Sequence, residues 1–320
     1  MTIDWDGNTE FAGNIKAYGN LSMNRLRDST IGNYSTTLGQ NNQAVAEYSL
    51  AEGQNTKAWS KWSHTEGENT QVGETINSSW GWASHAEGRD TRVFGDYSHA
   101  EGEGSYVAFG ISCAHAEGYY TEAYGSNAHT EGNRSIAYDN HSHAEGDTTK
   151  ASGVASHTEG NQTQTYSAAS HAEGYLTQAG PSDSDRSNIG WSSTADRTCA
   201  HAQNSRTKAL GFASHAEGTL TTAQGNVSHA EGRGTIAIGN EQHVQGRWNV
   251  ANNSYAHIVG GGTADDARKN IHTLDWNGNA SYLGDLKTNN GKRVPNVTVS
   301  TSAPTSNSTG KIGDLWIVYE

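Results

Sequence analysis

The chain has 320 residues, a formal net charge of -13 at pH 7 and only 33% hydrophobic residues. This composition is typical of a disordered chain unless a repeat allows many short units to stack. The negative charge excludes nucleic acids and anionic membranes as electrostatic partners, and no apolar run is long enough to span a membrane, so we expect a soluble protein without membrane insertion.

Residues 1–34 begin with a motif that returns near the other end of the chain, at Thr273–Asn279. In the first copy Asp6 and Gly7 stand between two apolar segments, which predicts a tight hairpin turn. We therefore expect one β-hairpin in residues 1–34 and another in residues 263–290. The hairpins would cover the unpaired strand edges at the two ends of the repeat region. Joining the chain to another protein is the alternative role.

Residues 35–262 repeat the motif S-H-A-E-G-x-x-T-x-A-x-G-x-x with a period of 14 residues. Thr36 and Leu50 take the place of the histidine in two earlier, degenerate turns. A period this regular predicts a solenoid. Longer intervals, each before one of His85, His115 and His201, indicate insertions. The repeat accounts for all but two of the chain's 15 histidines, namely His64, His85, His99, His115, His129, His143, His157, His171, His201, His215, His229, His243 and His257.

Each turn is expected to contain two short strands, S-H-A-E-G and T-x-A-x-G, joined by two-residue links after glycines that can adopt positive φ. Side chains alternate between the two faces of a strand, so Ser, Thr and Ala would fill a narrow interior. The outward residues of T-x-A-x-G vary freely, as at Lys150 and Gln164, which is typical of a solvent face. The fold class expected is all-β, a parallel β-roll of 14-residue turns.

The outward His and Glu of S-H-A-E-G hardly vary, which indicates that this sheet faces something that also repeats. A threefold axis of identical chains supplies such a partner, so we predict a homotrimer. Its axis would be lined by a ladder of His64, Glu66, His85, Glu87, His99, Glu101, His115, Glu117, His129, Glu131, His143, Glu145, His157, Glu159, His171, Glu173, His215, Glu217, His229 and Glu231.

Stacked glutamates repel one another, and histidine is the available hydrogen-bond partner, so the first interpretation of the ladder is structural. Ions on the axis, held by three symmetry-related imidazoles, are the alternative. Metal catalysis is disfavoured because a catalytic site does not need many copies, and no resident cofactor is expected. Cys113 and Cys199 stand five turns apart, too far for a disulfide, and are expected to be buried.

The sequence of residues 291–320, the C-terminal tip, predicts a small antiparallel β-meander. The segment D-D-A-R-K-N, which precedes the tip, predicts a short helical turn. The segments that break the repeat carry candidate receptor-binding aromatics, which suit sugar binding. Asp183, Asp185 and Asp196 in the third insertion are possible acids, but a solvated Ser/Asp-rich loop is favoured, and we expect no enzyme. The candidate receptor-binding residues are Trp80, Trp82, Trp191, Trp316 and Tyr319.

The S-H-A-E-G-x-x-T-x-A-x-G repeat resembles the head repeats of trimeric autotransporter adhesins, which also occur in tail fibres and appendages of bacteriophages. The resemblance covers residues 35–287 and implies a left-handed roll that trimerises. The segment from Tyr255 to Asp285 is similar to the one that follows such repeats in phage tail proteins.

The chain shows no signal peptide, coiled-coil stalk or membrane-anchoring domain of the adhesin family. We therefore expect a tail fibre of the virion that acts outside the cell, with tail or baseplate proteins and a host surface glycan or protein as partners. The head of a bacterial trimeric adhesin is the alternative.

Overall fold

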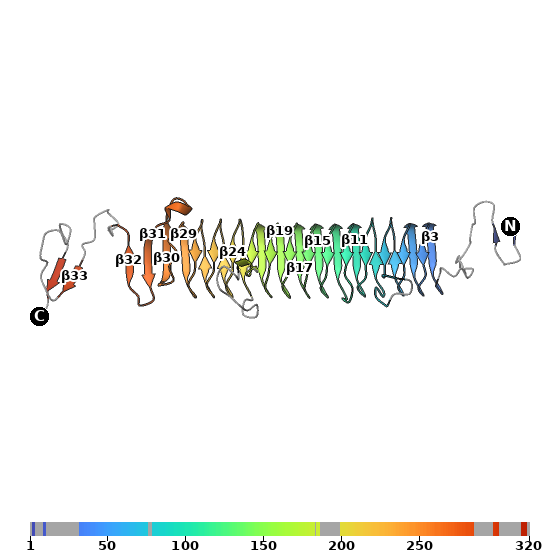
Figure 1. Cartoon of the computed structure of the whole chain (residues 1–320), viewed down its shortest axis with the longest axis horizontal. Coiled ribbons are helices and arrows are strands. Elements are labelled where there is room, and N and C mark those ends of the chain that lie inside the picture. The colour runs from blue at the N-terminus through green and yellow to red at the C-terminus, as the bar shows by residue number, and fades with distance from the viewer. Residues whose placement is uncertain are drawn as a thin grey trace, which may run out of the picture.

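The computed structural model describes residues 32–75, 79–182, 184–185 and 199–284, together with the backbone of four short strands outside these ranges. Residues 36–282 form a long, straight solenoid in which strand β3 lies at one end and β32 at the other (Figure 1). From β3 to β28, every turn contributes one strand to each of two parallel sheets. The predicted all-β parallel solenoid of 14-residue turns is therefore confirmed, with about fifteen turns.

The first sheet contains the S-H-A-E-G segments, paired in register so that His143 lies beside His157 and Glu145 beside Glu159. Its strands begin at the histidine and, in the longest cases, extend one residue beyond the glycine. In chain order they are β3 (Thr36–Gln40), β5 (Leu50–Gln54), β7 (His64–Thr65), β9 (His85–Ala86), β11 (His99–Glu103), β13 (His115–Tyr119), β15 (His129–Asn133), β17 (His143–Asp147), β19 (His157–Asn161), β21 (His171–Tyr175), β23 (His201–Ala202), β25 (His215–Ala216), β27 (His229–Ala230) and β29 (His243–Arg247).

The second sheet is 13-stranded and contains the T-x-A-x-G segments, whose strands are only two residues long because the chain turns at both sides of them. They are β4 (Gln43–Ala44), β6 (Lys57–Ala58), β8 (Gln71–Val72), β10 (Arg92–Val93), β12 (Tyr106–Val107), β14 (Glu122–Ala123), β16 (Ile136–Ala137), β18 (Lys150–Ala151), β20 (Gln164–Thr165), β22 (Gln178–Ala179), β24 (Lys208–Ala209), β26 (Thr222–Ala223) and β28 (Ile236–Ala237).

Small side chains fill the space between the two sheets, as predicted. Ala144 and Ala151 of one turn are fully buried, and Thr149 and Ser156 are buried with them. Burial of a methyl group contributes under about 1 kcal/mol, so the fold depends on many small contacts and on the backbone hydrogen bonds between turns. The sheets are close enough that little beyond Val is accommodated in a regular turn.

The links only partly follow the expectation about glycine. The glycine of S-H-A-E-G is left-handed, as at Gly146 with φ of +109°. The glycine of T-x-A-x-G is required for a different reason, because a Cβ at Gly153 would lie 2.1 Å from the carbonyl oxygen of Ser167 in the next turn. The left-handed residues of the links are themselves non-glycine, for example Thr148 at +60° and Ala155 at +52°.

All three insertions lie in the same corner of the solenoid, where the chain passes from the second sheet back to the first. They follow β8, β12 and β22, and the strands on either side remain in register, so that His171 still pairs with His201. Insertions at this corner leave the stacking of the turns intact. They therefore begin along one edge of the rod.

The two cysteines also lie at this corner, and the expectation that they are buried is wrong. Cys113 and Cys199 are exposed and have φ of +57° and +61°. Both occupy the left-handed link position that Ala155 has in a regular turn, where the side chain points away from the interior.

Strand β30 (Tyr255–Gly261) is the last parallel strand of the first sheet, and an antiparallel hairpin extends it. The hairpin consists of β31 (Asn270–Asp275) and β32 (Ala280–Tyr282), after a 3-10 turn η1 at Asp265–Ala267. Arg268 fixes this segment to the solenoid, donating hydrogen bonds to the carbonyl oxygens of Gly234 and Asn249. The hairpin thus covers the edge of the last turn.

Near the chain ends, β1 (Thr2–Ile3) pairs antiparallel with β2 (Thr9–Glu10), the pairing of a hairpin. The antiparallel meander expected in the tip is wrong, because β33 (Val297–Ser300) and β34 (Leu315–Val318) pair in parallel. The segment between them is long enough for the crossover that a parallel pair requires. Within the described residues, no helix is long and apolar enough to span a membrane.

Candidate functional site

The outward surface of the first sheet carries a continuous column of imidazoles, because in-register parallel pairing places identical side chains above one another. From His64 to His243 the rings of successive turns are stacked, with centroids 4.4 to 5.0 Å apart. The planes of these neighbours deviate by at most 13°. Every histidine of the predicted ladder lies in this column, and His201, which the prediction left out, lies there too.

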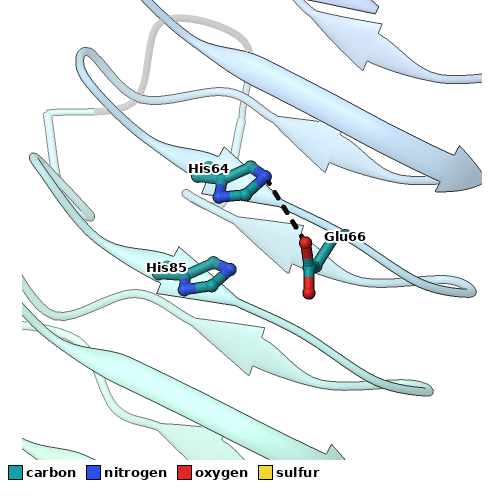
Figure 2. A group of neighbouring side chains, drawn as sticks. All are labelled: His64, Glu66 and His85. Atoms are coloured by element: carbon teal, nitrogen blue, oxygen red, sulfur yellow. Dashed lines mark ion pairs between the residues drawn. The ribbon is translucent and has the colours of Figure 1, made fainter. Parts of the chain in front are cut away.

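The glutamates of the ladder form a second column beside the imidazoles. We call the two columns together the His/Glu face. Figure 2 shows one unit, in which the Nε2 atom of His64 lies 3.8 Å from a carboxylate oxygen of Glu66 and the ring of His85 lies in the next turn. Most His–Glu separations are of this size, for example 3.8 Å between His143 and Glu145.

These separations are too long for hydrogen bonds, so the expected ladder of satisfied His–Glu bonds forms only in part. It is present near the ends of the column, where His64 Nε2 lies 3.1 Å from Glu52 and His243 Nε2 lies 3.3 Å from Glu231. Between them, the buried Nε2 atoms without a hydrogen-bond partner are those of His85, His99, His115, His129, His143, His157, His171, His201, His215 and His229.

Buried polar atoms are normally satisfied, and a whole row of unsatisfied nitrogens is unusual for a finished surface. The side chains themselves are only about two-thirds covered, as for His143, which is 34% exposed. The row therefore lies just below the surface, where an additional molecule could reach it.

The pKa values of six imidazoles of the column are lowered. For His85, burial and then the charges of His64 and His99 lower the pKa to about 4. Burial and stacked neighbours likewise lower the pKa of His115, His143, His157, His201 and His215. These six imidazoles are therefore neutral at pH 7, because a charge on any of them would face another imidazole about 5 Å away.

The pKa values of the glutamates are shifted mainly by neighbouring carboxyl groups and by burial, and less by histidine. A hydrogen bond to Glu159, together with burial and a second hydrogen bond to Glu131, raises the pKa of Glu145 to about 7. The pKa of Glu159 is lowered because it accepts from Glu173 and Glu145. Glu87, raised to about 7 by its bond to Glu101, repeats the pattern. Glu87 and Glu145 thus retain a proton to a higher pH than Glu101 and Glu159.

Comparison with known families agrees with this architecture. Residues 31–56 and 216–241 match the family model of the YadA head domain repeat. These two stretches of the chain are therefore similar to YadA head repeats. The first includes the degenerate turns at Thr36 and Leu50, which lack the histidine, so the match depends on the turn pattern and not on the His/Glu face. No curated protein matches the chain.

Metal binding by the His/Glu face within one chain is disfavoured by geometry. His and Glu ligand atoms do gather, for example those of His143, Glu145 and His157, which lie within 4.8 Å of one another. However, two Zn–N bonds of about 2.1 Å bridge at most about 4.2 Å, and parallel rings direct their Nε2 atoms the same way instead of toward one point. His143 and His157 are stacked with centroids 4.7 Å apart. An ion would need imidazoles from more than one chain.

The aromatic candidates of the first insertion join a column along the corner of the solenoid. Tyr34, Tyr48 and Trp62 stack with centroids 5.0 and 6.2 Å apart, and Trp82 packs edge-on against Trp62 at 5.9 Å. Trp80, 41% exposed, lies beside them in the chain. Because the stacked rings cover one another's faces, this column presents mostly ring edges to solvent.

The remaining candidates are placed less fully. Trp316 lies in strand β34, of which the backbone alone is described, and Trp191 and Tyr319 lie outside the described residues. Trp59, in the turn before the first insertion, donates its indole N–H to the side-chain oxygen of Gln43 on the second sheet at 2.9 Å.

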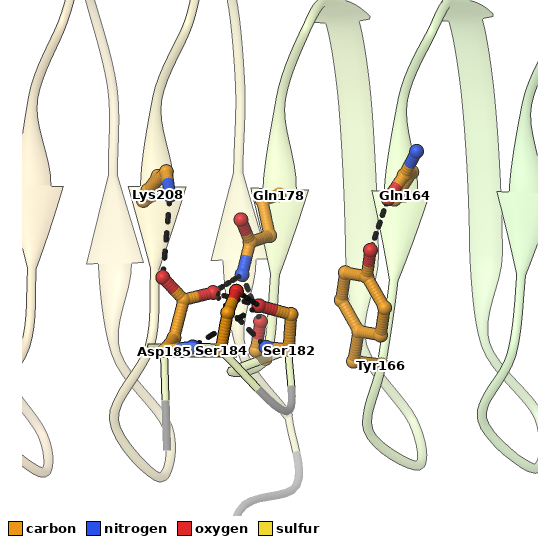
Figure 3. Close-up of polar contacts among 8 residues, drawn as sticks. Gln164, Tyr166, Gln178, Ser182, Ser184, Asp185 and Lys208 are labelled. Atoms are coloured by element: carbon orange, nitrogen blue, oxygen red, sulfur yellow. Dashed lines mark hydrogen bonds and ion pairs between the residues drawn. The ribbon is translucent and has the colours of Figure 1, made fainter. Parts of the chain in front are cut away.

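Of the three acids in the third insertion, Asp185 anchors the start of the loop (Figure 3). It accepts hydrogen bonds from Ser182 and Gln178 and pairs with Lys208 at 3.3 Å. Burial alone would raise the pKa of Asp185, but these hydrogen bonds and the charge of Lys208 outweigh it and lower the pKa. An ionised, fully engaged carboxylate suits a structural role. Asp183 and Asp196 lie outside the described residues.

The sequence reasoning missed a pocket on the second sheet, lined in part by Tyr106, Tyr120 and Tyr124. Tyr106 and Tyr124 belong to the T-x-A-x-G positions that were interpreted as a variable solvent face. The available signal was that three tyrosines gather in the two turns on either side of an insertion, whereas most turns carry polar residues at the positions of Tyr106 and Tyr120.

Proposed function

We propose that the chain forms the head of a homotrimeric attachment protein, with the His/Glu face of each copy turned toward a threefold axis. The observation that supports this most directly is the match to YadA head repeats at both ends of the solenoid. The family resemblance of the repeat implies trimerisation and binding to surfaces.

The His/Glu face gives independent physical support. Its row of buried Nε2 atoms lacks partners within the chain, and the same pair of residues recurs at each level. A partner that satisfies such a row must repeat with the same spacing, and another copy of the chain at the same height does so. The second sheet has no such constraint, because its outward residues change from turn to turn.

Trimerisation is tested by sedimentation equilibrium of the intact chain. We expect a species of three times the 34.1 kDa chain mass. A monodisperse monomer would refute the trimer and the role assigned to the His/Glu face.

Surface attachment is tested by measuring how fluorescently labelled trimers bind to candidate cells. Variants lacking residues 181–195 or 292–320 separate the third insertion and the tip from the rest, after each is shown to remain a trimer. Lost binding in one variant assigns recognition to that segment. Binding by neither the intact protein nor the variants, on every cell type tried, would leave a purely structural rod as the better account.

Two carriers are consistent with such a head. The YadA match favours a bacterial adhesin that acts outside the cell. The hairpin segment after the repeats resembles phage tail proteins and supports a second candidate, a tail fibre that binds tail or baseplate proteins at one end. Antibodies against the chain distinguish the two, since they would label either intact bacteria or purified phage particles in electron micrographs.

A further inference from the structure

The second sheet carries a pocket of about 420 Å³ on its outward surface, next to the insertion that precedes His115. Tyr106, Glu122 and Tyr124 line it from strands β12 and β14 and the link that follows. The pocket lies on the opposite sheet from the His/Glu face. It therefore stays open to solvent when that face is covered, and a trimer would present three copies at one height.

The pocket exists because one turn lacks a side chain at the corner. Gly104 occupies the link position where the neighbouring turns have Asp90 and Tyr120. The ring of Tyr120 lies across the vacant position, and a Cβ at Gly104 would come within 2.8 Å of it. The glycine also has φ of +70°, which disfavours other residues there. The backbone at Gly104 and the ring of Tyr120 therefore determine the shape of the pocket.

Tyr106 is the main aromatic wall of the pocket. The rings of Tyr106 and Tyr124 are 5.7 Å apart and tilted by 54°, so neither covers the other's face, whereas Tyr138 stacks on Tyr124 at 5.6 Å. Phe94 supports Tyr106 edge-on at 71°. This differs from the corner column, where Tyr34 and Tyr48 are stacked within 5° and hide their faces. Exposed aromatic faces suit a ligand with flat apolar C–H surfaces.

The polar groups around these rings can bind hydroxyls. One carboxylate oxygen of Glu122 accepts the hydroxyl of Tyr124 at 2.7 Å, which fixes the carboxylate beside the pocket. Asp90 is similarly held by the Nδ2 atom of Asn69 at 3.1 Å. Arg92 adds several N–H donors from strand β10. Two carboxylates against one guanidinium disfavour an anionic ligand.

We propose that this pocket binds a neutral hexose unit of a surface glycan, with the unit packed on Tyr106 and its hydroxyls bonded to Glu122, Asp90 and Arg92. The inference rests on the proposed attachment function and gives it a site and a ligand class. The volume lies within the range of roughly 300–1,000 Å³ typical of small-ligand sites.

The test is saturation-transfer NMR and calorimetric titration of the intact protein with maltohexaose, cellohexaose and mannohexaose, and with oligogalacturonate as the acidic probe. We expect at least one neutral probe to bind and the acidic probe to bind more weakly. Tyr106→Ala should weaken binding about tenfold or more, as for a central aromatic contact, and Glu122→Gln should weaken it while preserving side-chain volume. Tyr166→Ala, in the same column as Tyr124 but outside the pocket, is the matched control and should bind normally.

Circular dichroism and sedimentation of each variant establish that the fold is kept. Failure of every neutral probe, unchanged affinity in Tyr106→Ala, or preference for the acidic probe overturns the inference. Cell binding separates it from the proposed function. If trimers of Tyr106→Ala lose the sugar but attach to cells as well as the intact protein, this pocket is not the attachment site, although attachment itself stands. If the intact protein binds sugar but no cells, the proposed function fails alone.

Discussion

Replacing Glu145 by Gln should stabilise the protein above neutral pH, and the reason lies in the shared protons of the glutamate column. Glu145 has a pKa raised to about 7 by its hydrogen bonds to Glu159 and Glu131. A group whose pKa is raised on folding contributes stability that is complete below its unfolded value of 4.5 and is lost as the pH rises through about 7. Gln keeps an N–H donor for the neighbouring carboxylates at every pH.

The size of the effect follows from the pKa. The change from 4.5 to about 7 corresponds to at most about 3 kcal/mol. Since Glu145 is 30% exposed, solvent screening reduces this to about 1–2 kcal/mol. Two ionised carboxylates about 4.8 Å apart repel by roughly 3 kcal/mol at an effective dielectric of 20, which agrees in order of magnitude.

The assay is thermal unfolding followed by circular dichroism at pH 5 and pH 8. Relative to the wild type, Glu145→Gln should gain stability at pH 8 and change little at pH 5. Lys150→Gln, on the second sheet, is the control, because it changes one charge outside the glutamate column and should not gain at pH 8. An equal gain in the two variants, or no gain in Glu145→Gln at pH 8, would refute this account of the glutamate column.

Three further predictions concern the same architecture. Acid should destabilise the rod, because the pKa of His85 is lowered from 6.5 to about 4 on folding. The stability that this shift contributes is fully present above pH 6.5 and is lost as the pH falls toward 4. An unchanged melting temperature at about pH 3.5 would contradict this prediction. Gly153→Ala should lower the free energy of unfolding by about 1–3 kcal/mol because of overpacking against the next turn, whereas Gly239→Ala, where the nearest atom is 3.4 Å away, should change it by no more than about 0.5 kcal/mol. Equal losses of stability in denaturant unfolding would disprove this steric explanation. Changing Glu145 and Glu159 together to Lys should prevent trimer formation or lower the melting temperature strongly, whereas changing Lys150 and Gln164 to Ala should not. Sedimentation and calorimetry measure the two effects. Greater damage from the second pair would show that the second sheet, and not the first, faces the axis.

The sequence by itself determined the solenoid, its period and the side of each residue. A strict interval between His143, His157 and His171 can be satisfied only by in-register stacking, and alternation along a strand then places Ala inside and His and Glu outside. For the same reason the histidines and glutamates of the ladder could be placed together on one face, and the insertions could be located from the intervals alone. These properties depend on local pattern and on the geometry of one turn.

The tertiary structure decided what depends on distances between turns. The raised pKa of Glu145 arises because carboxyl groups of the two neighbouring strands lie beside it. The role of Gly153 depends on a carbonyl oxygen of the following turn. The pocket at Gly104 combines side chains from three successive turns, and Tyr120 was recognised as part of it only once the stacking placed its ring over the glycine. The pattern of a single repeat does not contain such contacts, because it determines only the path of the backbone. The variable side chains of neighbouring turns determine whether the surface between them is filled or forms a pocket.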